Sequence, residues 1–391
     1  MKHVPFTYRP RPTLLPPQIE RVPTRPAEYR EADFRQRFDA ETLFFDAIYA
    51  DERRDTALIL APPPFNLAGP LRATRATAQP SSSTCALKLE ELDRHGRAWV
   101  RVPAGTTHLE LGGVFGRLDV PLAANCSDAF RGRRVLLTVT KDNELDWIQD
   151  WIRYHRDRHR ADAVLLYDNG STAYTPEDLA EAVARLSGIE VAGIVVWPFK
   201  YGPQGRADGR FWDSDFCQNG ALEHARWLFL RSARSVLSVD VDELVVSGDT
   251  RTVFERAEAA WHGSARFNGY WMYGFADRGP TSDAELSFRD FEYYLNSAQR
   301  PAAEALGVEA LCPTKWAVVP ARCPARAQWC AHRIKRWLPG YLASSGLSYR
   351  HFREISHHWK LNRRQRPRFD PQVFVHDAEL LASYAKVSWS A

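Results

Sequence analysis

Two aspartates and a glutamate interrupt an apolar, β-branched run in the segment VLSVDVDELVV, residues 236–246. Asp240 and Asp242 stand two residues apart, so on a strand their side chains would point to the same face. Carboxylates beside a buried strand carry a high desolvation cost unless a positive charge compensates them. Mg²⁺ and Mn²⁺ are suitable ions because they prefer carboxylate oxygens as ligands. The segment therefore predicts a divalent metal site, against the alternative of a strand-end turn whose acids are simply solvated.

The segments around this acidic run alternate between strand-like and helix-like patterns. Short apolar runs, typical of buried strands, lie at 135–140, 163–168, 189–197 and 235–246. Amphipathic or capped segments, typical of helices, lie at 141–160, 175–188 and 213–233. Because parallel strands need helical crossovers, the alternation predicts an α/β fold with a mostly parallel sheet and flanking helices.

This topology places carboxylates together at one edge of the sheet. Asp168 ends the second predicted strand, and Asp240 and Asp242 end the fourth. Ligands of open parallel sheets bind at the carboxyl ends of the strands. A metal ion held there commonly bridges to the phosphates of a substrate. We therefore expect a phosphate-containing ligand at this edge.

The composition divides the 391-residue chain into four regions. Residues 1–38 are rich in proline and arginine and predict a flexible arm. Short apolar runs between turn-forming residues predict a small β-rich accessory module at 39–130. The α/β pattern occupies 131–365, and a C-terminal tail covers 366–391.

Charge and cysteine spacing narrow the function classes. The formal net charge is only +4, so the whole chain does not resemble a nucleic-acid-binding protein. The six cysteines form no CxxC pair, and the segment from Cys312 to His332 matches no usual zinc spacing. No run approaches the ~20 apolar residues that span a bilayer. A cytoplasmic protein is expected, with peripheral contact between the basic N-terminus and an acidic membrane left open.

A longer motif set begins at the first strand, in VLLTVTKDNELDWIQDWIRYHRDRHRADAVLLYDNGST. This segment resembles the opening of a glycosyltransferase domain of the GT-A fold, in the branch related to family 2 and family 92 enzymes. The family pattern runs strand, KNE, a helix ending W..YH, and a strand ending DNGS. The matching residues are Lys141, Asn143, Glu144, Trp151, Tyr154, His155, Asp168, Asn169, Gly170 and Ser171, with one residue inserted after Lys141.

The resemblance extends over about residues 134–364. The family's metal motif D.DEF is matched at 240–244, with Leu244 in place of the aromatic residue. Later matches are Lys315 in PTKWAVVPARC, His332 in CAHRI and, loosely, His351, Phe352, Ser356 and Lys360 in HFREISHHWK. The resemblance implies a Rossmann-like GT-A domain behind the accessory module.

The resemblance also implies roles for these residues. Asp240, Asp242 and His332 would hold Mn²⁺ or Mg²⁺, with His351 as the rival of His332. The residues that would bind a nucleotide diphosphate sugar are Thr140, Asn143, Glu144, Asp168, Asn169, Lys315, His351 and Lys360. The implied activity is transfer of a hexose to a glycan or glycoconjugate acceptor, as in polysaccharide biosynthesis, with inversion favoured over retention.

The acceptor side is expected in RFNGYWMYGFADRG, residues 266–279. Asp277 is the expected general base, with Glu285 and Glu292 as alternatives. The aromatic residues of this segment would stack on sugar rings or belong to the core. Residues 296–313 would order over the donor as a lid.

Two other functions compete with the transferase. One is another metal-dependent phosphate-ester enzyme, such as a phosphatase or nucleotidyltransferase, built on the same acidic strand end. A phosphatase that forms an aspartyl phosphate usually carries its DxD after the first strand, whereas here the motif follows the fourth. The other is a non-catalytic carbohydrate-binding protein, which would not need the acid pair.

Overall fold

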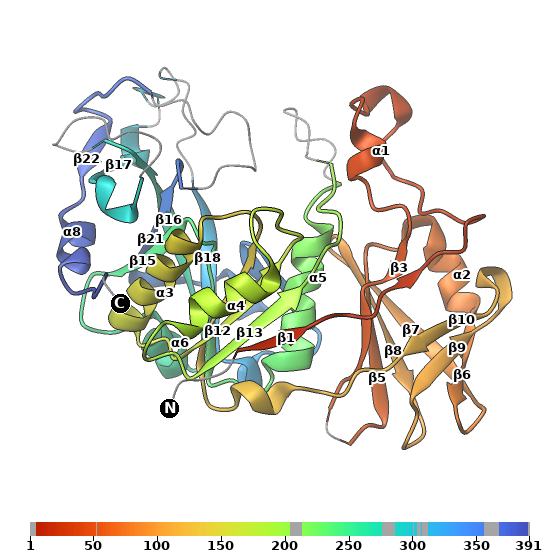
Figure 1. Cartoon of the computed structure of the whole chain (residues 1–391). Helices are drawn as coiled ribbons and strands as arrows, with labels where there is room; N and C mark the ends of the chain where they lie inside the picture. Colours follow the sequence, from red (N-terminus) through yellow and green to blue (C-terminus); the bar gives the residue numbers. More distant parts are fainter. Residues whose placement is uncertain are drawn as a thin grey trace.

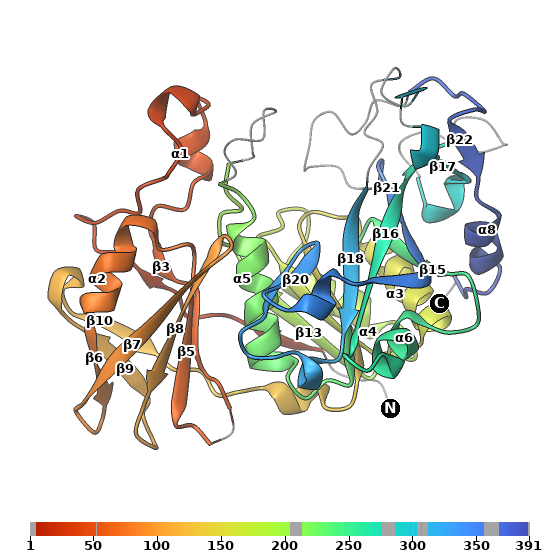
Figure 2. The same cartoon turned by 180° about the vertical axis from the view of Figure 1, so that it is seen from behind.

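The computed structural model contains an α/β part and a β-rich part, which lie side by side in Figures 1 and 2. It describes residues 5–51, 53–203, 213–275, 286–299, 301–302, 306, 312–355 and 367–389. The predicted α/β class, with helices flanking a large sheet and a β-rich module before it, is confirmed. The exact domain boundaries stay predictions.

Five neighbouring strands of the large sheet run parallel. Their order is β1 (Phe6–Tyr8), β13 (Val191–Val196), β12 (Ala163–Asp168), β11 (Arg134–Thr140) and β14 (Ser235–Ser238). Side chains of these strands alternate between two cores, because successive residues of a strand face opposite ways. Leu136 packs in one core, whereas Val135 and Leu137 pack in the other.

The other half of the large sheet begins where β18 pairs antiparallel with β14. Its remaining strands are β16 (Ser264–Tyr273), β17 (Tyr293–Leu295), β18 (Cys312–Val318) and β22 (Phe374–His376), with β15 (Glu243–Ser247) joined through β21 (Ala343–Phe352). The predicted single strand at 235–246 is therefore wrong. The chain turns at 239–242, so β14 and β15 pair with different neighbours.

Helices cover both faces of the parallel strands. α3 (Leu145–His159) and α4 (Pro176–Ala184) lie on the face toward the viewer in Figure 1, and α5 (Phe216–His224) on the face shown in Figure 2. Thr175 caps α4 as predicted, by accepting a hydrogen bond from Asp178 N. The other helices in the described part are the short α1 (Phe34–Arg37), α2 (Ala68–Ala73), α6 (Val253–Ala259) and α8 (Ala378–Tyr384). None of the helices described is long and apolar enough to cross a bilayer.

The β-rich part is a seven-stranded antiparallel sheet with its own apolar core. Its strands, in sheet order, are β10 (Leu118–Pro121), β9 (His108–Leu111), β6 (Arg75–Gln79), β7 (Ser83–Leu92), β8 (His95–Arg101), β5 (Thr56–Ala61) and β4 (Asp46–Tyr49). The apolar runs of the sequence did not predict strands β6 and β7. Two small two-stranded antiparallel sheets, β2 (Thr13–Leu14) with β3 (Thr42–Phe44) and β19 (Gln328–Cys330) with β20 (Arg333–Lys335), complete the described strands.

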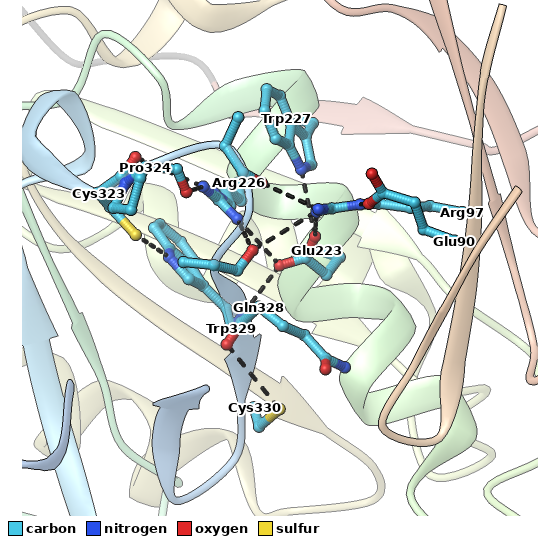
Figure 3. A network of polar contacts seen from close by, with 12 residues as sticks. Glu90, Arg97, Glu223, Arg226, Trp227, Cys323, Pro324, Gln328, Trp329 and Cys330 are labelled. Carbon is cyan, nitrogen blue, oxygen red and sulfur yellow. Dashed lines mark hydrogen bonds and ion pairs between the residues drawn. The ribbon is translucent and has the colours of Figure 1, made fainter. Parts of the chain in front are cut away.

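A buried charge network joins the two parts (Figure 3). Glu223 on α5 is fully buried, and its carboxylate lies 3.0 Å from Arg97 Nη1 of β8 and 3.4 Å from Arg226 Nη1. The backbone N–H of Trp329 donates to the same carboxylate at 2.8 Å. Burial alone would raise the pKa of Glu223, but Arg226 and Arg97 outweigh it, so its pKa lies below the usual value. The β-rich part is therefore fixed to α5 by a satisfied ionic contact.

The N-terminal segment is built into the fold and is not the flexible arm that its composition predicted. β1 extends the large sheet beside β13. Arg21 is buried and donates to the carbonyl oxygens of Pro63, Asp39 and Thr42 at 2.7–2.8 Å. Arg25 is fully buried, with its Nε 2.6 Å from Asp213 Oδ2. The arginine content of the segment predicted exposure, because charged side chains are costly to bury unless they are paired. Here carbonyl oxygens and a carboxylate surround the buried arginines and satisfy them.

Deletion of residues 1–38 is therefore expected to lower the free energy of unfolding by more than about 5 kcal/mol. The deletion removes a strand and leaves Asp213 buried without Arg25, and breaking one buried pair alone costs about 3–5 kcal/mol. Urea denaturation followed by circular dichroism measures the change. Arg9→Ala is the matched control, because the pair of Arg9 with Glu177 is exposed on both sides. A truncated chain with wild-type stability would contradict this.

Candidate active site

The register of the parallel strands brings two loops to one edge of the sheet. Thr140 at the end of β11 pairs with Asp168 at the end of β12. On the other side, Leu137 of β11 pairs with Ser238 of β14, so the turn at 239–242 lies beside the end of β11. As the sequence predicted, the carboxylates of Asp168 and of the acidic run therefore share the carboxyl edge.

The first loop positions Asp168 by local hydrogen bonds. Its Oδ1 accepts from the backbone N–H of Ser171 at 3.2 Å, and its side chain is almost fully buried. Burial raises the pKa of Asp168, while the hydrogen bonds from Ser171 oppose the rise. Asn143 Nδ2 donates to Thr140 Oγ1 at 2.8 Å, which ties the start of the next loop to β11. Polar side chains at positions 140, 143 and 168 therefore lie together at the carboxyl ends of β11 and β12.

Two other residues predicted to bind the donor have different surroundings. Asn169 Nδ2 donates to the carbonyl oxygens of Trp197 and Phe199 at 2.7 and 2.8 Å, so both of its N–H donors hold the loop after β13. Glu144 precedes α3 as its N-cap residue, and its exposed side chain makes no capping bond. Asn169 is therefore structural in this arrangement, whereas the Glu144 carboxylate faces solvent.

The acidic run forms a tight turn, not the continuous strand assumed for its side chains. Glu243 N donates to Asp240 O at 3.1 Å, and Asp240 N donates to the Glu243 carboxylate at 2.8 Å. Asp240 and Asp242 consequently face different partners. The turn places the fully buried Glu243 carboxylate between them.

Lys315 supplies one compensating charge for these acids. Its Nζ, on β18, lies 2.6 Å from Asp240 Oδ2 and 3.0 Å from Glu243 Oε2. The ammonium is buried, with a side chain only 2% exposed. Burial lowers the pKa of Lys315, but Asp240 and Glu243 outweigh it, so the net shift is upward and the lysine stays charged.

His351 on β21 is the second partner of the acids. β15 and β21 pair Glu243 directly with His351. His351 Nε2 lies 3.1 Å from Asp242 Oδ2, and its Nδ1 lies 3.4 Å from Glu243 Oε1. The Trp271 ring packs against the imidazole in a tilted arrangement, with the ring centroids 4.3 Å apart and an angle of 34° between the ring planes. Trp271 is thus a wall of this site, a role that its neighbours in sequence do not reveal.

Within the residues that the structure describes, Asp242, Glu243 and His351 form the one group that can hold a metal ion, with ligand atoms within 4.8 Å of one another. Glu243 Oε1 is buried and accepts no hydrogen bond within the described residues. A buried oxygen without a hydrogen-bond partner is available to bind a cation. Burial raises the pKa of Glu243, opposed by Lys315 and reinforced by Asp240 and Asp242. Two carboxylates and one imidazole fit Mn²⁺ well and Mg²⁺ less well.

All six cysteines are free thiols.

This group differs from the predicted set of Asp240, Asp242 and His332. Asp240 pairs with Lys315, and His332 lies in the turn after β19 with an exposed side chain. The charges around His332 are those of Lys315, Asp240, Asp215 and His351. Partial desolvation and then Lys315 lower its pKa, so its imidazole is neutral at neutral pH. Glu243 stands next to Asp242 in the sequence and is the glutamate of the matched D.DEF motif, and these two signals could have identified it.

The remaining predicted residues divide into two sets. Asp277, Glu285 and Lys360 lie outside the described residues, as does half of the predicted lid at 296–313. Glu292 is described, and its carbonyl oxygen accepts from Asp377 N. Tyr270 packs on Tyr294, with ring centroids 5.0 Å apart. Tyr273 is buried in a small aromatic core, which favours the packing role over sugar stacking for that residue.

Two histidines of α3 fix β15, the strand that follows the acidic turn. His155 Nδ1 lies 2.9 Å from Trp151 O, and its Nε2 accepts from Val245 N at 3.4 Å. His159 Nε2 donates to Val245 O at 2.7 Å, and its Nδ1 accepts from Val253 N. Burial lowers the pKa of His155 to about 3 and that of His159 to about 4. Both imidazoles are therefore neutral in the folded protein.

Acid is expected to destabilise the protein through these two histidines. Their pKa values are depressed on folding, so the stability they contribute is complete above the unfolded value of 6.5 and is lost as the pH falls toward the folded values. Each contributes up to about 1.4 kcal/mol per pH unit, or about 5 kcal/mol together over roughly two units. Urea denaturation at several pH values measures the slope. His159→Gln should flatten it, whereas the exposed His376→Gln is the control; an unchanged slope in His159→Gln would contradict the assignment.

Comparison with known proteins adds a partial likeness to glycosyltransferases. No family model and no curated protein matches this sequence. The galactosyltransferase LgtC, solved with donor and acceptor sugar analogues, aligns at 13% identity and a TM-score of 0.27, over 48% of this chain and 58% of its own. Glucosyl-3-phosphoglycerate synthase from Mycobacterium tuberculosis, solved with Mn²⁺, UDP-glucose and phosphoglyceric acid, aligns at 15% identity and a TM-score of 0.24, over 50% of this chain and 59% of its own.

The bifunctional glycosyltransferase WbbM aligns at 11% identity and a TM-score of 0.27, over 54% of this chain and 37% of its own. The chain thus spans less than two thirds of each of these structures. Likenesses at these scores support no conclusion about activity, which has to come from the side chains at the sheet edge.

Proposed function

We propose that the protein is a metal-dependent glycosyltransferase of the GT-A type, which moves a sugar from a nucleotide diphosphate sugar to a glycan or glycoconjugate acceptor. One observation carries the proposal. The loop of Asp168 and the group of Asp242, Glu243 and His351 meet at one carboxyl edge of a parallel sheet. The first resembles a nucleotide site and the second a metal site, as a nucleotide diphosphate requires.

The nucleoside end of the donor would lie against the ends of β11 and β12. There Asp168 would accept a hydrogen bond from the base or ribose, and Thr140 and Asn143 would line the floor. This assignment keeps the predicted roles of these residues. It gives the N–H donors of Asn169 a structural role, because they already bond two carbonyl oxygens.

The diphosphate would lie over the acidic turn. Asp242, Glu243 and His351 would hold Mn²⁺ or Mg²⁺, and the bound ion would neutralise the charge that develops on the diphosphate leaving group. Lys315 holds Asp240 and Glu243 in place and adds a fixed positive charge beside the leaving group. Trp271 would orient His351 by packing against its ring.

The acceptor hydroxyl must lose a proton during transfer. With inversion, a carboxylate takes this proton directly, and Asp277 stays our proposed base because it follows β16, whose Trp271 lines the site. Lys360 stays a proposed phosphate ligand on the same reasoning, since it follows His351 of β21.

A donor screen by isothermal calorimetry tests the function, with UDP-, GDP-, dTDP- and CMP-sugars titrated in the presence of Mn²⁺ and of EDTA. We expect one donor to bind in Mn²⁺ and to lose most of its affinity in EDTA. Binding that is equal in EDTA would contradict the metal dependence of the proposal. No binding of any nucleotide sugar would overturn the proposal.

Asp168→Ala is expected to weaken the nucleotide part of this binding. Loss of one hydrogen bond to a charged group costs about 1.5–3 kcal/mol, or roughly 10- to 150-fold in the dissociation constant. Calorimetry with the corresponding nucleoside diphosphate measures it, with the melting temperature as the test of folding. Asp128→Ala is the matched control, because that carboxylate lies in an exposed surface pair. An unchanged dissociation constant for Asp168→Ala would remove this residue from the donor site.

A further inference from the structure

A short 3₁₀ turn after β20 displays apolar side chains to solvent. The turn, η10 (Leu338–Tyr341), presents Leu338 at 76% exposure and Tyr341 at 42%, and the next residue, Leu342, is 44% exposed. Residues three apart in a 3₁₀ helix lie one above the other, so Leu338 and Tyr341 point the same way. Neighbouring large apolar side chains on a surface indicate a binding site more often than isolated ones do.

The turn is rigidly held, so this exposure is a fixed feature of the fold. Trp337, just before it, is buried, and Gly340 N donates to Trp337 O at 3.0 Å. A Cβ at Gly340 would lie 2.2 Å from Ile334 O, so the chain packs closely there. Arg266 Nη1, from β16, donates to Tyr341 O at 2.8 Å. β20 and this turn lie on the face toward the viewer in Figure 2.

Arginines without carboxylate partners surround the same turn. Within the described part of the chain, Arg266, Arg333 and Arg336 are among the arginines that form no ion pair with an acidic residue. The Arg333 guanidinium lies 5.9 Å from the centre of the Tyr341 ring. Burial, and then the positive charge of Arg333, lower the pKa of Arg266. The segment 333–347 contains no acidic residue.

We propose that the η10 face, made of Leu338, Tyr341, Leu342, Arg333 and Arg336, docks the protein on a bilayer that contains anionic lipids. The apolar side chains would enter the boundary between headgroups and acyl chains, and the arginines would pair with lipid phosphates. An anionic bilayer attracts unneutralised cations, and the exposed leucines beside them can enter its apolar part.

The charge of the η10 face argues against a second copy of the chain as its occupant. A two-fold contact would bring the same arginines toward each other, with no carboxylate between them. The basic N-terminus is a weaker candidate for the membrane contact, because Arg25 is buried against Asp213, and Arg35 and Arg37 pair with Glu20 and Asp33.

Hydrogen bonds connect the η10 face to the candidate active site, but the membrane proposal does not depend on the function of that site. Thr314, next to Lys315 on β18, accepts from Arg266 Nε at 3.1 Å and donates to the carbonyl oxygen of His332 at 2.6 Å. Docking would therefore bring the end of β18 that carries Thr314 and Lys315 toward the membrane. Membrane binding itself would stand even if the transferase proposal failed.

Vesicle sedimentation with the full-length chain tests this. We expect binding to vesicles of phosphatidylcholine mixed with phosphatidylglycerol, and much weaker binding to pure phosphatidylcholine or at high salt. Arg333→Gln/Arg336→Gln should weaken binding about thirtyfold, at about fivefold for each cation near the surface. Leu338→Ser/Leu342→Ser should weaken it at least about tenfold. All four positions are exposed or at the surface, so the melting temperature should stay close to wild type.

The matched controls lie in the β-rich part. Val114→Ser removes an equally exposed apolar side chain, and Arg101→Gln removes an exposed cation. Both should bind as wild type does. The proposal is overturned if the wild-type chain does not sediment with anionic vesicles, or if the η10 variants bind as the controls do. It is also overturned if Leu338→Ser/Leu342→Ser only dissolves a dimer seen by analytical ultracentrifugation, with vesicle binding unchanged.

Discussion

Asp242→Asn is expected to lower kcat/KM for sugar transfer about a thousandfold and to abolish measurable Mn²⁺ binding. Asp242 is one of three side chains whose ligand atoms converge within 4.8 Å, and neutralising it removes both a ligand and a charge. A bound metal supplies several kcal/mol of stabilisation to a developing negative charge, which corresponds to a rate factor of this size. Calorimetry with Mn²⁺ and a radiolabelled transfer assay measure the two effects.

The same substitution should not harm the fold. It removes one of three carboxylates that crowd a buried turn, so the free energy of unfolding without metal should stay equal or rise slightly. Asp128→Asn is the control for a general effect of removing an acid, because its ion pair with Arg131 is exposed. Wild-type activity in Asp242→Asn would remove the metal assignment, and with it the main support for the transferase.

Lys315→Met is expected to destabilise the protein by about 3–5 kcal/mol at neutral pH. The ammonium is buried between Asp240 and Glu243, and its removal leaves the Glu243 carboxylate in the interior without its closest cation. Breaking a buried pair by removing one partner has about this cost. Urea denaturation measures the loss. Mn²⁺ should restore more stability to this variant than to the wild type, because the ion would then be the main neutralising charge.

Lys335→Met is the control that separates this effect from the general effect of replacing a lysine. The pair of Lys335 with Asp93 is about one third exposed on each side, so its loss should cost only about 0–1 kcal/mol. If both lysine variants lose the same small amount, Lys315 does not carry the charge balance of the acidic turn. If Lys315→Met is destabilised but Mn²⁺ does not help, the acids bind no ion.

The sequence predicted the elements of the α/β part well where the pattern is local. The amphipathic helix predicted within 141–160 is observed over Leu145–His159, and Thr175 caps α4; both follow from spacing and side-chain chemistry within one or two turns. Composition failed for residues 5–38, since proline and arginine content does not report that β1 pairs with β13 or that Arg25 meets Asp213. Those contacts join positions far apart in the chain.

For the candidate site, the sequence by itself determined which chemistry is present: a cluster of acids after a strand, a second acid after another strand, and basic residues farther on. Only the tertiary structure decided which of these meet. Lys315 neutralises Asp240, and His351, rather than His332, joins Asp242 and Glu243, because β18 and β21 come to the acidic turn through sheet pairing. Ligand groups form across strands whose register is set by burial of the whole sheet, and no local pattern in the chain encodes that register.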